Sequence, residues 1–205
     1  MTTTDARPHG MRREERTADA PFARPTSIPG VLLLAPKVHR DPRGFFRELW
    51  HEDRYADAGI TTPFVQDNVS YSERGVLRGM HYQHPAAQGK LVTAVLGHVY
   101  DVVVDVRAGS PTFGRWEAFD LTEENGLQLY VPAGLAHGFL VRSAVALFAY
   151  KCTTVYAPAL EHVLRWDDPD VGIEWPTDVT YTVSPRDAAG RRLRDLAPHQ
   201  LPVWA

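Results

Sequence analysis

The segment Arg78-Gly79-Met80-His81 combines residue types that a plain core strand does not need. Histidine titrates close to neutral pH and can act as a base. Arginine can bind an anionic oxygen through a fork of N–H donors, and glycine lets a ligand or another backbone approach closely. Taken alone, the segment also fits a hydrogen-bonded core histidine beside a surface arginine. It therefore marks His81 as a candidate base that needs partners elsewhere in the chain.

Three further residues could complete a proton-transfer site. Lys90 follows a glycine at the start of an extended run, where its ammonium could stabilise a developing oxyanion. Tyr150 lies within an alternating run, where its ring could pack and its hydroxyl could form a hydrogen bond. Asp187 lies in a turn that leads into a short helix, so it could cap that helix or orient a histidine ring. Each residue also has an ordinary structural explanation when it is considered alone.

The spacing Pro132-x-Gly134-x-x-His137 resembles the second conserved motif of cupins, which are small β-barrel jelly rolls. In metal cupins this histidine is a ligand, and the first motif supplies two more histidines and a glutamate. Here His81 and His84 are three residues apart and no glutamate follows nearby. A metal needs three or four convergent ligands. The motif therefore favours the fold more than it favours a metal site.

The sequence around these residues consists of many short runs typical of β-strands, separated by Gly, Pro, Asn and Asp. Such a pattern favours an all-β sandwich or barrel. The expected strands cover residues 31–34, 45–50, 64–70, 75–81, 90–96, 99–106, 116–121, 128–131, 138–141, 146–154 and 162–166. A short helix is expected over 53–58, closed by Gly59, and a helix or irregular segment over 187–196. In the run 99–106, Asp101 and Asp105 share one face, so they either reach solvent or line a polar cavity.

The composition is that of an ordinary globular domain: 205 residues, 44% hydrophobic and 23% charged. The net charge of -3 gives no basic surface for nucleic acid, and no apolar stretch approaches the roughly 20 residues of a membrane helix. The single cysteine, Cys152, excludes an intrachain disulfide and fits a reducing cytoplasm. We expect residues 1–26 to form a flexible tail without a secretory signal and residues 27–205 to form one domain.

These segments together resemble the dTDP-4-dehydrorhamnose 3,5-epimerase family of deoxysugar synthesis, from about Ile28 to Gly190. The matching segments, in family order, are residues 41–48, 64–68, 75–83, 88–92, 101–107, 109–114, 132–139, 156–158, 167–170 and 184–190. The resemblance implies a cupin-like jelly-roll barrel with a few short helices, a homodimer, and neither a metal nor an organic cofactor. The substrate it implies is a 4-keto-6-deoxyhexose carried on dTDP.

The resemblance also implies roles for individual residues. His81 matches the catalytic base, and Asp187 matches the carboxylate that partners it. Tyr150 matches the acid on the opposite face of the sugar, and Lys90 matches the group near the C4 oxygen. The matching positions around the diphosphate, nucleotide and sugar are Arg43, Arg78, Phe46, Glu48, Gln66, Asn68, His137 and Tyr156.

The chemistry explains why such residue types are needed. A hydrogen on C3 or C5 is acidic because it lies next to the C4 ketone, and its removal places negative charge on O4. One well-placed oxyanion donor lowers such a barrier by roughly 3–4 kcal/mol. Inversion requires the proton to return from the opposite face, where a second group must wait. The expected reaction is epimerisation of dTDP-4-keto-6-deoxy-glucose at both C3 and C5, giving dTDP-4-keto-rhamnose.

Three alternatives stay open at the level of sequence. The first is a mono-epimerase that acts at C3 or C5 only, in a secondary-metabolite deoxysugar pathway. The second is a metal-dependent cupin that uses His81, His84 and His137. The third is a sugar-nucleotide binding module without turnover, although such a module would be free to lose at least one of the four catalytic residue types.

Overall fold

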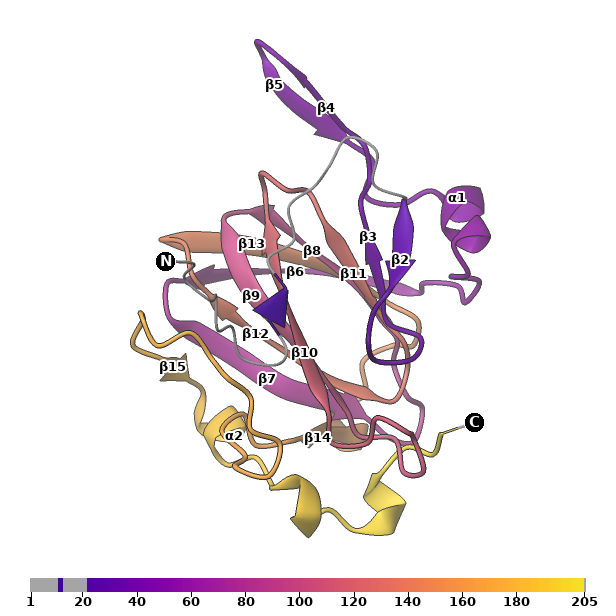
Figure 1. Ribbon diagram of the computed structural model, residues 1–205, viewed down its shortest axis with the longest axis vertical. Helices are drawn as coiled ribbons and strands as arrows, with labels where there is room; N and C mark the ends of the chain where they lie inside the picture. The colour runs from indigo at the N-terminus through magenta and orange to yellow at the C-terminus, as the bar shows by residue number, and fades with distance from the viewer. Residues whose placement is uncertain (1–10, 13–21, 205) are drawn as a thin grey trace, which may run out of the picture.

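The computed structural model describes residues 11–12 and 22–204, and two facing β-sheets form its framework (Figure 1). The strands of the first sheet are β1 (Met11–Arg12), β7 (Val76–Gln83), β9 (His98–Asp105), β10 (Trp116–Thr122), β12 (Leu135–Val141), β14 (Glu161–Val163) and β15 (Thr182–Val183). Within the described residues this sheet has seven strands in the order β1-β10-β9-β12-β7-β14, with β15 pairing beside β7. Its pairings are antiparallel except β1 with β10 and β15 with β7.

The second sheet has six strands in the described part of the chain. They are β2 (Ala23–Pro25), β3 (Leu32–Leu34), β6 (Gln66–Glu73), β8 (Lys90–Leu96), β11 (Gln128–Val131) and β13 (Val145–Cys152). Their order is β2-β3-β11-β8-β13-β6, and all neighbours are antiparallel. Two facing, largely antiparallel sheets confirm the predicted all-β jelly-roll class.

Strand β9 shows how the pattern of residues builds two hydrophobic layers. Val99 and Val103 belong to the cluster between the sheets, which also holds residues of β8, β11 and β13. Tyr100, Val102 and Val104 point the other way, into a second cluster with residues of the C-terminal segment. Both faces of the seven-stranded sheet are therefore covered. Asp101 and Asp105, on the inner face, are fully buried rather than solvated.

The helices are short. They are α1 (Glu52–Asp57), α2 (Pro185–Ala188) and the 3₁₀ turns η1 (Pro158–Leu160), η2 (Leu193–Asp195) and η3 (Pro198–Gln200). Helix α1 and Gly59 after it, at φ +92°, confirm the predicted helix with its closing glycine. The segment predicted as a helix or irregular wrap over 187–196 consists of the end of α2 and the turn η2.

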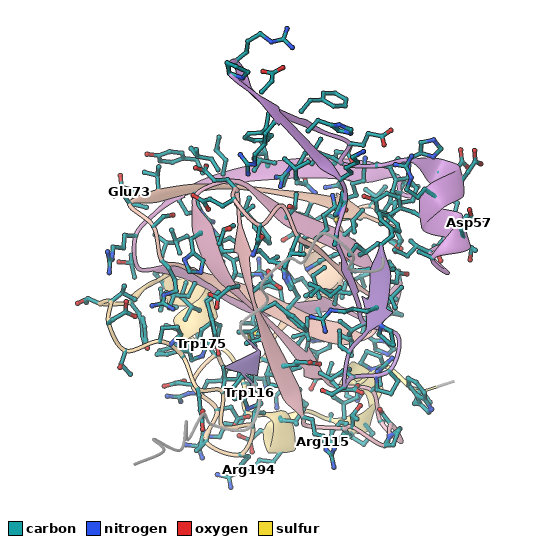
Figure 2. The ribbon with its side chains drawn as sticks, turned by 45° about the horizontal axis from the view of Figure 1, so that its top comes forward. Asp57, Glu73, Arg115, Trp116, Trp175 and Arg194 are labelled. Carbon is teal, nitrogen blue, oxygen red and sulfur yellow. The ribbon has the colours of Figure 1, made fainter. Side chains whose placement is uncertain are left out.

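A two-stranded hairpin, β4 (Val38–Asp41) with β5 (Gly44–Arg47), stands apart from both sheets. The strand predicted over 45–50 is shorter than expected and pairs only within this hairpin. Asp41 closes the turn by accepting a hydrogen bond from the Arg43 backbone N–H at 2.8 Å. The hairpin projects from the body in Figure 1, and Figure 2 shows its side chains extending away from the rest of the molecule.

Two strands precede residue 27, where the domain was expected to start, and the first of them, β1, pairs with β10. Strand β2 pairs with β3, so the six-stranded sheet begins at Ala23, ahead of the expected domain start at residue 27. Apart from β1 and residues 22–26, the tail predicted over 1–26 lies outside the described residues. No helix in the described part of the chain is long and apolar enough to cross a membrane.

Candidate active site

A cavity of about 560 Å³ opens between the two sheets. Strands β6, β8 and β13 supply one wall, β7 and β12 supply the other, and β15 with α2 closes one side. The cavity brings together most of the predicted site residues: His81, Lys90, Tyr150, Asp187, Gln66, Asn68, Arg78, His137 and Tyr156.

His81 on β7 meets Asp187 at the start of α2. The ring Nε2 lies 2.7 Å from Asp187 Oδ1, and the Gly79 N–H donates to Oδ2 at 3.2 Å. The Asp187 backbone N–H donates to the Ser184 hydroxyl at 3.1 Å, which caps the helix. Burial alone would raise the pKa of Asp187, but the hydrogen bonds from His81 and Gly79 outweigh it and hold that pKa below its usual value.

The ionised carboxylate of Asp187 decides which ring nitrogen of His81 can react. A carboxylate only accepts hydrogen bonds, so His81 Nε2 must carry the proton and donate. Nδ1 is then the basic nitrogen, and it has no hydrogen-bond partner among the residues that the structure describes. The pair therefore leaves Nδ1 of His81 as the nitrogen that can accept a proton, as a general base requires.

Gly79 makes this arrangement possible. Its φ is +130°, and a Cβ at this position would lie 2.6 Å from the Gly138 Cα on the neighbouring strand β12. The register of β7 and β12 shifts at this contact, and His137 lies directly opposite His81. The glycine thus admits another backbone rather than a ligand.

His137 forms a second histidine–aspartate pair next to the first. Its Nε2 lies 3.0 Å and 2.9 Å from the two carboxylate oxygens of Asp101 on β9. Both side chains are buried, and Asp101 is wholly inaccessible to solvent. Burial raises the pKa of Asp101, although His137 and the nearby Lys90 act in the opposite direction.

Lys90 opens β8 on the facing sheet, and its ammonium makes no hydrogen bond to any residue that the structure describes. Burial lowers the pKa of Lys90, and the carboxylates of Glu161 and Asp101 counteract this effect. The neighbouring Cys152 contributes little charge, because burial raises the pKa of its thiol and keeps it neutral. Lys90 therefore lies at the cavity without a fixed partner.

Tyr150 on β13 belongs to the sheet opposite His81. Burial raises the pKa of its phenol, so the hydroxyl is a neutral proton donor near pH 7. No hydrogen bond joins this hydroxyl to another of the described residues. A base on one sheet and an acid on the other face the same cavity, which is the arrangement that inversion at carbon requires.

The outer part of the cavity carries polar residues that sequence reasoning also selected. Gln66 Nε2 donates to Asn68 Oδ1 at 3.0 Å, and Gln66 Oε1 accepts from the Tyr156 backbone N–H at 2.8 Å. Arg78 is exposed and donates through Nε to the Ser72 hydroxyl at 3.1 Å and through Nη2 to the Tyr71 carbonyl at 3.5 Å. Its remaining guanidinium N–H groups can therefore meet an anionic ligand.

Two charged residues of the lining, Glu161 and Arg186, were missed in the sequence analysis. They form an ion pair, and the Tyr156 hydroxyl donates to Glu161 at 3.0 Å while Arg186 Nη1 donates to that hydroxyl at 3.3 Å. Arg186 directly precedes Asp187, so placing Asp187 in the site was a signal for it. Glu161 had no such signal, because its position depends on the pairing of β14 with β7.

Arg43, Phe46 and Glu48 do not reach the cavity of the same chain. Arg43 pairs with Asp41 in the hairpin turn, with Nη2 at 2.6 Å from Oδ2. Phe46 is 66% exposed, and Glu48 forms an ion pair with Arg54 of α1. The hairpin holds Arg43 and Phe46 outside the body of the protein, and Glu48 directly follows it.

The described residues offer no ligand set for a metal ion. Among the described residues, no group of three or more His, Cys, Asp or Glu side chains is placed to hold a metal ion. His84, the third candidate ligand, does not line the cavity, and its backbone carbonyl accepts from His162 at 3.0 Å.

The fold and the cavity define an acid–base enzyme built in a cupin-like jelly roll. The model of the dTDP-4-dehydrorhamnose 3,5-epimerase family matches residues 25–195, and the chain belongs to this family. A dTDP-4-dehydrorhamnose 3,5-epimerase of Neisseria gonorrhoeae is 48% identical over 166 residues, which cover 81% of this chain. The chain spans about half of that relative, 51% of its length.

Two solved structures show the likeness in three dimensions. A dTDP-6-deoxy-D-glucose-3,5-epimerase of Legionella pneumophila, in complex with dTDP-4-keto-L-rhamnose, has a TM-score of 0.87 and 46% identity, covering 89% of this chain and 98% of that chain. A 3′-monoepimerase of Streptomyces bikiniensis, in complex with dTDP-quinovose, has a TM-score of 0.83 and 41% identity, covering 87% and 92%.

Proposed function

We propose that this protein epimerises dTDP-4-keto-6-deoxy-glucose at C3 and C5, giving dTDP-4-keto-rhamnose. The observation that carries the proposal is the pairing of two proton-transfer groups across one cavity. The His81–Asp187 pair lies on one sheet and the neutral Tyr150 hydroxyl on the other, and Lys90 lies in the same cavity without a fixed partner.

Each group has a defined part in the reaction. His81 Nδ1 removes the proton next to the ketone, and Asp187 stabilises the imidazolium that forms. Lys90 stabilises the negative charge on O4, an effect of roughly 3–4 kcal/mol for one good donor. Tyr150 then delivers its proton to the opposite face of the carbon. Burial disfavours the resulting phenolate, so Tyr150 regains a proton readily and His81 releases its own.

The outer cavity is suited to hold the nucleotide and the sugar. Arg78 has free N–H donors for the diphosphate. Gln66 and Asn68 offer amide groups, and Tyr156 offers an exposed ring for contact with the base. We assign His137 to the sugar, because it lies beside His81 in the register of β7 and β12.

Isotope exchange tests the reaction directly. The protein is incubated with dTDP-4-keto-6-deoxy-glucose in deuterated water, and the deuterium at C3 and C5 is counted by NMR. Two deuterons support epimerisation at both carbons. One deuteron supports a mono-epimerase, the activity named for the Streptomyces bikiniensis structure. Absence of exchange at both carbons overturns the proposal.

The protruding hairpin supports a homodimer in which Arg43, Phe46 and Glu48 serve the cavity of a second copy. Phe46 is exposed and the hairpin does not line the cavity of its own chain, so the hairpin is free to contact the cavity of a second copy. Mixing Arg43→Ala and His81→Ala proteins, with subunit exchange, tests this. Activity should return in the mixture, since one site then has both residues. A mixture as inactive as its components, or a protein that sediments as a monomer, contradicts the proposal.

The other classes meet specific obstacles. A metal site lacks a third ligand, because His84 does not line the cavity and no group of three His, Cys, Asp or Glu side chains converges among the described residues, so activity should survive a chelator and metal analysis should find less than one ion per chain. A binding module without turnover has no need for an unpartnered Lys90.

We also propose a cytoplasmic location, which a single buried cysteine fits.

A further inference from the structure

Asp101 is a buried carboxylate to which the proposed reaction gives no role. It lies on β9, between the two sheets, and is wholly inaccessible to solvent. A buried carboxylate is costly unless it is paired and hydrogen-bonded. Its partners are therefore informative, and both of them, His137 and Lys90, line the cavity.

The contact with His137 restricts the ring completely. Nε2 lies within 3.0 Å of both carboxylate oxygens, and a diagonal position across β9 and β12 places the two side chains on the same face. Since a carboxylate accepts, Nε2 carries the proton. Nδ1 is then the ring nitrogen left for a ligand, because no described residue bonds it.

The relation to Lys90 is electrostatic. Lys90 comes from the facing sheet and makes no hydrogen bond within the described part of the chain. Burial lowers its pKa, while the carboxylates of Glu161 and Asp101 favour its charged form.

We propose that Asp101 is a positioning residue for the reaction, which fixes His137 with Nδ1 available to the sugar. The inference rests on the proposed function. Asp101 acts through His137 and does not line the cavity itself.

Asp105 supplies a matched control on the same face of the same strand. It is also buried, but its oxygens accept from Arg107 at 2.9 and 2.8 Å and from the hydroxyls of Ser110 and Thr112 at 2.6 Å. None of these residues lines the cavity. Asp105 therefore fastens the loop after β9, and its loss should affect stability but not turnover.

The experiment compares Asp101→Asn with Asp105→Asn. In Asp101→Asn we expect kcat to fall at least about tenfold while KM changes much less, because the corresponding change in a Ser-His-Asp triad costs about 10⁴ in kcat through the wrong tautomer. Asp105→Asn should keep kcat per folded molecule. An unchanged kcat in folded Asp101→Asn, or an equal loss of kcat in both variants, overturns the proposal.

A second measurement does not depend on turnover or on the folding of a variant. Long-range ¹⁵N NMR of the wild-type histidines should show His137 as the Nε2–H tautomer with a slowly exchanging proton. Finding the Nδ1–H tautomer overturns the proposal. If the wild type exchanges no deuterium while His137 is the Nε2–H tautomer, the proposed function has failed but the positioning of His137 has not.

Discussion

The two histidine–aspartate pairs lie opposite each other on β7 and β12, yet their surroundings differ. In the pair at the cavity surface, His81 is 25% exposed and Asp187 6%. In the inner pair, His137 is 7% exposed and Asp101 0%. The same bond type, Nε2 to a carboxylate, therefore occurs once where solvent can reach it and once where solvent scarcely can.

The supports of the two carboxylates differ as well. Asp187 belongs to the four-residue helix α2 and is held by bonds from His81 and Gly79. Asp101 lies in the middle of β9, between β10 and β12. The pKa of Asp187 is lowered by its hydrogen bonds and that of Asp101 is raised by burial. The contrast suits the outer pair to proton transfer and the inner pair to holding a fixed geometry.

The largest expected effect is on the outer pair. His81→Ala should lower deuterium exchange by about 10³-fold, within the usual contribution of a general base of 10²–10⁴. Binding of dTDP and the far-UV circular dichroism should be preserved, because His81 is only partly buried. Retained exchange would show that His137, or another group, is the base, and the contrast between the pairs would fail.

The next effect tests the cation beside the inner pair. Lys90→Met should lower kcat about 10²–10³-fold, the loss typical of a removed oxyanion donor. Lys151→Met is the control, since Lys151 lies on β13, the strand beside β8, but donates to the exposed Asp67 at 2.7 and 2.8 Å. Steady-state kinetics give the kcat of each variant for this comparison. Equal losses would mean that a general charge effect, rather than Lys90, is measured.

A smaller loss is expected when the outer carboxylate is neutralised. Asp187→Asn should lower kcat about 10–100-fold, as is common for outer groups that orient a functional histidine. Unlike Asp101, Asp187 is at the cavity, so water can partly replace it. Ser184→Ala removes only the cap of α2 and serves as the milder control. A wild-type rate in Asp187→Asn would remove the outer pair from the mechanism.

Much of this architecture could be predicted from sequence, because alternation and turn residues determine short strands locally. The strands over 90–96 and 128–131 have the predicted bounds. Period 2 also placed Asp101 and Asp105 on one face. It could not tell which of them meets the cavity, because that depends on the pairing of β9 with β12 and on the approach of the second sheet. The separation of the hairpin from both sheets could not be predicted for the same reason, because strand pairing depends on the three-dimensional arrangement of the chain.

The smallest effect is on stability, and it should have opposite signs for the two carboxylates. The pKa of Asp187 in the folded protein lies below its unfolded value of about 3.8. Its ionisation therefore adds to the free energy of unfolding above that pH, and this gain is lost as the pH falls through the folded pKa. The pKa of Asp101 is raised in the folded protein. Its protonated form therefore adds to the free energy of unfolding at low pH, and this gain is lost as the pH rises through the folded pKa.

Urea unfolding of the wild type and of the two Asn variants, between pH 3 and pH 7, measures this difference. Relative to the wild type, Asp187→Asn should lose more stability at pH 7 than at pH 3, whereas Asp101→Asn should lose more at pH 3 than at pH 7. The pH trend matters here, since each variant also loses a hydrogen bond at every pH. The same trend in both variants would show that the two carboxylates have equivalent surroundings, contrary to their burial.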